Sequence, residues 1–177
     1  MPLGGEGGVR GRYAIDGRRR MMRRREREIK NKETITAILE QSLVGRIATV
    51  NRKGFPVIKP VNFVYWDGKI YIHSSRRGEK MADIRRGSLV CFEVDEPIAY
   101  VAAREPACGG SYYYRSIIAK GRAALVSHRE KKLRILKRMM EKYQPEGGYG
   151  GTPEELLMKT AVIEILIEEI TGKENLG

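Results

Sequence analysis

The stretch PVIKPVNFVYWDGKIYIHSS, residues 56–75, contains two strand patterns separated by a turn signal. Residues 56–65 and 70–74 are rich in β-branched and aromatic residues, and the second of these segments alternates along its length. Between them stands Asp67-Gly68, a dipeptide that favours the tight turn of a β-hairpin. The stretch therefore predicts two antiparallel strands, and the rest of the chain extends this pattern.

Four more segments have the character of strands, namely residues 46–50, 89–94, 113–126 and 161–170. Gly121 interrupts the long third segment, and we interpret it as a bend or bulge. Six strands with few helices between them favour a mainly β (α+β) antiparallel barrel over a doubly wound parallel sheet.

Helical spacing and start signals mark four peripheral helices. Thr34 is expected to cap a helix over residues 35–43, and a short helix is expected to follow Gly78. Ser127 and Glu130 form a capping-box pattern that opens a helix ending near Tyr143. The remaining signals predict a helix start at residues 152–155 and a loop over residues 97–110.

The composition limits the class of protein. A chain of 177 residues and 20.1 kDa corresponds to about one domain. Two Cys and two His make a disulfide framework or a zinc site improbable, so we expect no metal. No segment approaches the roughly 20 apolar residues of a membrane span, and no apolar secretory segment opens the chain. We therefore expect a cytoplasmic protein with no membrane partner.

The net charge of +12 is concentrated near the N-terminus. Residues 1–30 hold ten Lys/Arg and four Asp/Glu, which is half of the excess. We predict a disordered basic leader at residues 1–21, followed by one folded domain at 22–177. The cationic run at residues 18–27 fits either a nucleic-acid-binding arm or a solvated tail. Because no aromatic residues interrupt it for base stacking, the tail is favoured and a nucleic-acid partner is not expected.

Common catalytic motifs are absent from the sequence, including the phosphate-binding P-loop, the dinucleotide-binding glycine motif and the Gly-x-Ser-x-Gly elbow. Polar residues instead gather on the predicted hairpin and its exit: Lys59, Asn62, His73, Ser74, Ser75, Arg76, Arg77 and Lys80. A helix start near Gly78 beside hydroxyls and cations fits an anion site. It fits equally well a surface turn whose charges are solvated.

Several motifs in order along the chain resemble one family. They are residues 23–29 (RRREREI), 44–49 (VGRIAT), 60–65 (PVNFVY), 70–75 (IYIHSS), 78–80 (GEK), 114–117 (YRSI) with Gly121-Arg122, and 171–173 (TGK). Together they span about residues 22–173. The sequence resembles the pyridoxamine 5'-phosphate oxidase-like family, and within it the branch of the nitroimidazole reductases, or nitroimidazole-resistance proteins.

The resemblance implies a six-stranded split β-barrel that binds FMN, forms a homodimer and holds two flavins at the subunit interface. Lys80 matches the phosphate-binding lysine, and Lys59 falls where relatives often carry a basic residue. The backbone of Pro60, Val61 and Asn62 would lie along the isoalloxazine edge. His73 and Ser74 would lie by the ribityl chain or ring, and Ser116 matches a flavin-contacting position. His73 also fits an ordinary strand histidine, and Ser116 a core hydroxyl.

The resemblance is incomplete at the C-terminus. The oxidases end in a segment with Trp and Arg that completes the substrate site, whereas Trp66 is the only Trp here and four residues follow Lys173. We therefore expect an FMN-dependent reductase that takes electrons from NADH or NADPH and passes them to a small acceptor. No residue is assigned as catalytic. A flavin carrier or sensor without turnover, a nucleic-acid-binding module, and deazaflavin or haem in the same cleft remain alternatives.

Overall fold

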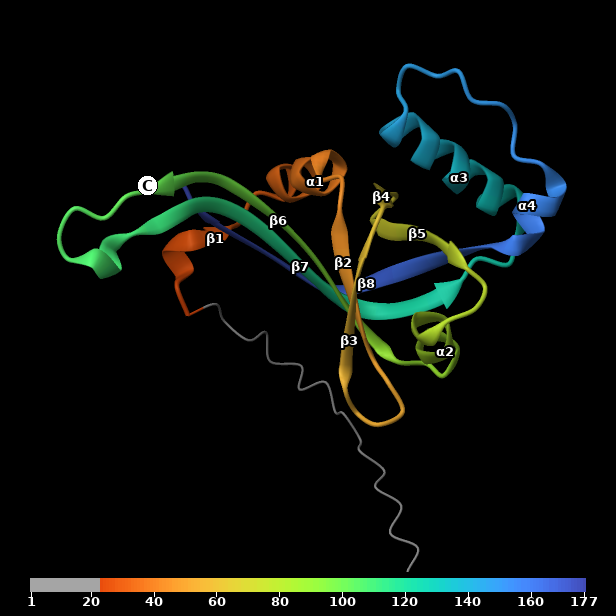
Figure 1. The fold of residues 1–177 in the computed structure, drawn as a ribbon, viewed down its shortest axis with the longest axis horizontal. Coiled ribbons are helices and arrows are strands. Elements are labelled where there is room, and N and C mark those ends of the chain that lie inside the picture. The colour runs from red at the N-terminus through yellow and green to blue at the C-terminus, as the bar shows by residue number, and fades with distance from the viewer. Residues whose placement is uncertain (1–22) are drawn as a thin grey trace, which may run out of the picture.

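The computed structural model describes residues 23–177 (Figure 1). Within this range lie the strands β1 (Glu28–Ile29), β2 (Gly45–Val50), β3 (Pro56–Val61), β4 (Phe63–Trp66), β5 (Lys69–Ser75), β6 (Leu89–Val101), β7 (Ser111–Leu125) and β8 (Thr160–Asn175). The helices are α1 (Lys32–Gln41), α2 (Glu79–Arg85), α3 (Arg129–Tyr143) and α4 (Glu154–Lys159), with 3-10 turns at Arg25–Arg27 and Ala107–Gly109. The predicted leader, residues 1–21, lies outside the described residues, as does the first half of the cationic run.

The strands form one antiparallel sheet in the order β3-β2-β6-β7-β8-β5-β4, and β1 pairs with β8. Its two edge strands, β3 and β4, are consecutive in the chain and are separated by Asn62 alone. The sheet must therefore curl until its edges approach each other at this residue. Figure 1 shows β6 and β7 as a long curved hairpin on one side of the molecule and α3 with α4 on the other. The predicted mainly β, antiparallel architecture is confirmed.

The number of strands differs from the six predicted. The pattern at residues 56–65 is divided between β3 and β4, and the short β1 had no sequence signal. Residues 97–101, expected in a loop, continue β6 past a register shift between Pro97 and Ala99. Pro97 lacks an N–H to donate, so pairing is interrupted there and then resumes.

Two predicted helix caps are wrong. The side chain of Asn31, three residues before Thr34, accepts the Thr34 N–H at 2.9 Å and starts α1 at Lys32. At α3 the N-cap residue is His128, one residue after Ser127, without a side-chain cap bond, and the Glu130 carboxylate pairs with Arg129 at 3.1 Å. The helices themselves lie where they were expected.

The core has two parts. Apolar residues from all the long strands and from α1 and α2 fill the inside of the curled sheet, among them Ile47, Phe63, Ile72, Phe92 and Ile163. A second cluster joins β4, β5 and β8 to α3 through Val64, Tyr71, Ile135, Met139 and Val162. Among the described residues, no helix is long and apolar enough to span a membrane.

Gly121 allows β7 and β8 to approach each other closely at a bulge. The register shifts between Lys120 and Gly121, which confirms the predicted irregularity. A Cβ atom on Gly121 would lie 1.9 Å from the carbonyl oxygen of Leu166, so any side chain must displace backbone.

We therefore expect Gly121→Ala to lower the free energy of unfolding by about 1–3 kcal/mol, as forced overpacking does. Urea denaturation measures the change. Gly150→Ala is the matched control, because nothing lies within 4 Å of the added Cβ. Equal stability of the two variants would contradict the assignment of Gly121 as a close-contact position.

Candidate functional site

The predicted polar cluster lies where β3, β4, β5 and α2 meet. Lys59 is on β3, and Asn62 is the residue between β3 and β4. Phe63 pairs with Ile72, so the next position in the register brings Asn62 opposite His73 at the end of the β4–β5 ladder. Lys80 is the second residue of α2, which follows β5 directly. Four predicted site residues are thus brought to one corner of the sheet.

The basic groups at this corner influence one another. Burial lowers the pKa of the Lys80 ammonium, and the positive charge of Lys59 lowers it further. The pKa of His73 is lowered by burial first and then by the charge of Lys80. An anion bound among these groups would relieve both penalties, since it favours their charged forms.

Few carboxylates neutralise this basic cluster, by which we mean Lys59, His73 and Lys80. Lys59 Nζ lies 3.8 Å from a Glu79 carboxylate oxygen, with both side chains nearly half exposed. Such a pair contributes little, about 0–1 kcal/mol. Within residues 23–177, Lys80 has no ion pair. The cluster therefore retains positive charge that a phosphate can take up through charge-assisted hydrogen bonds.

The helix start contributes less than the sequence indicated. α2 begins after Gly78, as predicted, and Gly78 adopts φ +111, a conformation that favours glycine. No side chain caps this end, and the helix has only seven residues. Its aligned dipoles are few, so the cations rather than the helix terminus account for the attraction of an anion.

The two arginines before α2 differ in their contacts. The Arg76 guanidinium donates to the carbonyl oxygen of Met158 at 2.9 Å, so it is engaged with the end of α4. The Arg77 N–H donates to the Ser75 hydroxyl at 3.3 Å. Within residues 23–177 the Arg77 guanidinium has no hydrogen bond or ion pair of this kind, so it is the less engaged of the two.

His73 has a neighbour that the sequence did not indicate. Its Nδ1 lies 3.2 Å from the sulfur of Met139, on α3. The alternation of β5 directs Ile70 and Ile72 into the barrel core and His73 toward α3. No local pattern indicates this contact, because residues this far apart in the chain meet only in the tertiary fold.

Other predicted residues lie beside or away from the cluster. Val61 packs partly against the core, Pro60 is exposed on β3, and Ser74 follows His73 on β5. Ser116 is on β7, opposite Asp95 and Lys173. Ser116 pairs with Lys173 on β8, whereas His73 pairs with Val162, eleven residues away along the same strand. A single subunit does not bring Ser116 to the cluster.

The outer face of the sheet carries exposed apolar side chains beside Pro60 and Ser116. We use this name for the side of β3, β2, β6 and β7 that bears Val44, Arg46, Ile58, Pro60, Ser116 and Ile118. Cross-strand pairing places Pro60 opposite Arg46 and Arg46 opposite Glu93, which pairs with Ile118. Ile58 is 61% exposed and Val44 is 49% exposed. Arg46 forms ion pairs with Glu93 and Asp95 on this face.

Residues that ligate metals are dispersed. No group of three or more His, Cys, Asp or Glu in the described part of the chain is arranged to hold a metal ion.

One protein family matches most of the chain. The family model described as pyridoxamine 5'-phosphate oxidase matches residues 31–174. Among curated proteins, none matches the sequence.

Solved structures share the fold. The flavocytochrome Anf3 of Azotobacter vinelandii is 23% identical with a TM-score of 0.79, covering 89% of this chain and 73% of that protein. The FAD and haem binding protein of Mycobacterium smegmatis is 19% identical with a TM-score of 0.77, covering 85% and 74%. A protein described as a 5-nitroimidazole antibiotic resistance protein, from Bacteroides thetaiotaomicron, is 22% identical with a TM-score of 0.73, covering 82% and 85%.

The coupling within the basic cluster is directly testable. Lys80→Met removes the charge that lowers the pKa of His73, so that pKa should rise. NMR titration of the imidazole signals measures it, and the chain has only two His, so His128 supplies the reference signal. Lys53→Met, on the exposed turn between β2 and β3, is the control and should leave the titration of His73 as it was. If the pKa of His73 is unchanged in Lys80→Met, the charge of Lys80 does not act on His73.

Proposed function

Because the chain belongs to the pyridoxamine 5'-phosphate oxidase family, we propose that it is a flavoprotein that binds FMN at the basic cluster. The observation that carries this proposal is the convergence of Lys59, His73 and Lys80 at one corner of the sheet, with Lys80 lacking an ion pair within residues 23–177. One terminal phosphate matches a cluster of this size and charge.

The residues present fit a flavin phosphate. Lys80 would hold it, with Lys59 and Arg77 nearby, and His73 and Asn62 would lie on the side where β4 meets β5. Bound flavin supplies hydride and electron transfer, while the chain binds and orients it. The names of the similar structures, a flavocytochrome and an FAD and haem binding protein, support a flavin as the class of cofactor.

We further propose that the protein is an oxidoreductase. NADH or NADPH would be the electron donor and a small molecule the acceptor, in the cytoplasm where these donors are kept. The structure described as a 5-nitroimidazole resistance protein supports this reading of the family branch. Reduction of bound flavin by NADH or NADPH in stopped flow tests it, since a carrier or sensor would stay oxidised.

Two copies of the chain would complete the site. The outer face exposes the apolar side chains of Val44, Ile58 and Ile118 around the Arg46 ion pairs, and exposed apolar residues of this kind suit a contact between subunits. Two-fold contact between identical surfaces is the commonest form of oligomer. Because Ser116 is on the same face as Pro60 but far from it within one subunit, a second copy is the natural source of Ser116 for a shared site.

We expect the purified protein to bind FMN, and Lys80→Ala to weaken binding by about 1.5–3 kcal/mol, the worth of a charge-assisted hydrogen bond. The visible spectrum and a fluorescence titration with FMN and with FAD measure this. Lys53→Ala removes an equal charge from an exposed turn and should bind FMN like the original protein. A protein that is colourless and takes up neither flavin would refute the proposed function.

We expect a homodimer in solution, with twice the 20.1 kDa mass of one chain. Ile58→Glu places a charge on the outer face and should shift the mass measured by light scattering toward a single chain. Leu156→Glu is the control, because Leu156 is similarly exposed at 54% but lies on α4. A dimer that persists in Ile58→Glu would rule out the outer face as the contact.

A further inference from the structure

Asp83 is a charged side chain buried away from solvent. It is on α2 and is 2% exposed, as is Thr49 on β2, and these are the buried polar side chains of the described residues. Removing a carboxylate from water is costly, and a buried ion pair contributes little net stability. Its presence calls for an explanation other than stability.

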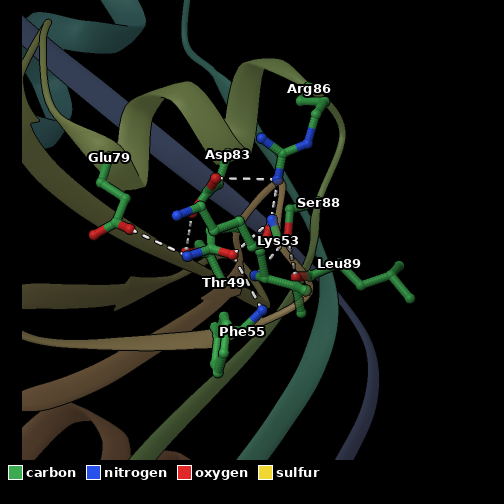
Figure 2. Close-up of polar contacts among 10 residues, drawn as sticks. Thr49, Lys53, Phe55, Glu79, Asp83, Arg86, Ser88 and Leu89 are labelled. Atoms are coloured by element: carbon green, nitrogen blue, oxygen red, sulfur yellow. Dashed lines mark hydrogen bonds and ion pairs between the residues drawn. The ribbon is translucent and has the colours of Figure 1, made fainter.

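Both oxygens of the Asp83 carboxylate have partners (Figure 2). One accepts the Thr49 hydroxyl at 2.8 Å, and the other accepts the Arg86 guanidinium at 3.0 Å. The same Arg86 nitrogen donates to the carbonyl oxygen of Val50 at 2.6 Å. The C-terminal half of α2 is thereby fastened to the last residues of β2.

The first turn of α2 is fastened to the same segment of chain. The side-chain amide of Asn51 donates to Glu79 at 3.4 Å, and its oxygen accepts the N–H groups of Lys53 and Phe55 at 2.9 and 3.1 Å. Glu79 also faces Lys59. Residues 49–51 therefore contact α2 at both ends, as Figure 2 shows for Thr49, Asp83, Arg86 and Glu79.

α2 takes its orientation from these contacts together with the burial of Met81 and Ile84 in the core. A helix of seven residues is not stable by itself in water, so tertiary contacts fix how it is rotated. Lys80 lies on α2 three residues before Asp83 and, within residues 23–177, has no ion pair of its own to hold it. Where its side chain starts is consequently set by the orientation of α2.

We propose that the buried Thr49–Asp83 hydrogen bond positions Lys80 against Lys59 and His73, which makes Asp83 and Thr49 positioning residues of the basic cluster. As a statement about FMN it rests on the proposed function, but the geometry of the cluster is testable without any flavin.

The experiment uses Thr49→Val, which has nearly the same shape, leaves every charge in place and removes the hydroxyl that Asp83 accepts. If α2 rotates and Lys80 moves away, the pKa of His73 rises, as measured by NMR titration of the flavin-free protein. Asp83→Asn is the second variant. Loss of its negative charge alone would lower the pKa of His73, so a rise there reports movement of Lys80. Thr36→Val, on α1, is the matched control and should leave the titration unchanged.

In the same variants FMN should bind about tenfold more weakly, the lower end of what losing one charge-assisted bond costs. A lower melting temperature with an unchanged pKa of His73 in both variants would overturn the positioning role and leave a purely structural one. If the original protein binds no FMN but the pKa of His73 rises in Thr49→Val, the positioning role stands and the proposed function fails.

Discussion

The two edges of the sheet are joined by a single residue, Asn62, and this connection constrains the rest of the molecule. In an open sheet with these seven strands in order, the two edges would be far apart, because each step from one strand to the next adds about 4.8 Å. One residue cannot span that distance, so the sheet has to close on itself. The Gly121 bulge, where β7 and β8 approach too closely for a side chain, is one of the places where the necessary curvature is introduced.

Closure determines where the charged groups meet. β3 and β5 are far apart in the strand order, yet Lys59 and the chain leaving β5 arrive at the same corner because both flank the Asn62 connection. The charge of Lys80 then lowers the pKa of His73, and the charge of Lys59 lowers the pKa of Lys80. Like charges held close together destabilise a protein slightly, and a bound anion would offset that cost. The arrangement therefore supports the proposed anion site better than a stabilising role.

The sequence predicted the features that depend on local pattern. The hairpin around Asp67-Gly68, the helix after Gly78 and the irregularity at Gly121 follow from turn chemistry and alternation, and all are present. The division of residues 56–65 at Asn62 was missed because the apolar pattern runs through it without a break, and only closure of the sheet separates β3 from β4. The predicted Ser127 cap is wrong by one residue, since α3 starts at Arg129 with His128 as its N-cap. Contacts such as His73 with Met139, or Thr49 with Asp83, join distant parts of the chain and leave no local signal.

The placement of Ser116 links the fold to the proposed assembly. Ser116 shares a face of the sheet with Pro60, yet β2 and β6 lie between β3 and β7. A change of side-chain rotamer within one subunit therefore cannot bring the two residues into contact. The residues between them are not ordinary surface: Arg46 is engaged with Glu93 and Asp95, and Val44, Ile58 and Ile118 expose apolar side chains around these ion pairs. A second copy laid over this face, as proposed, would bury the apolar residues and place its own Ser116 over the same surface as Pro60. The separation that argues against a one-subunit site is therefore the same feature that favours a shared one.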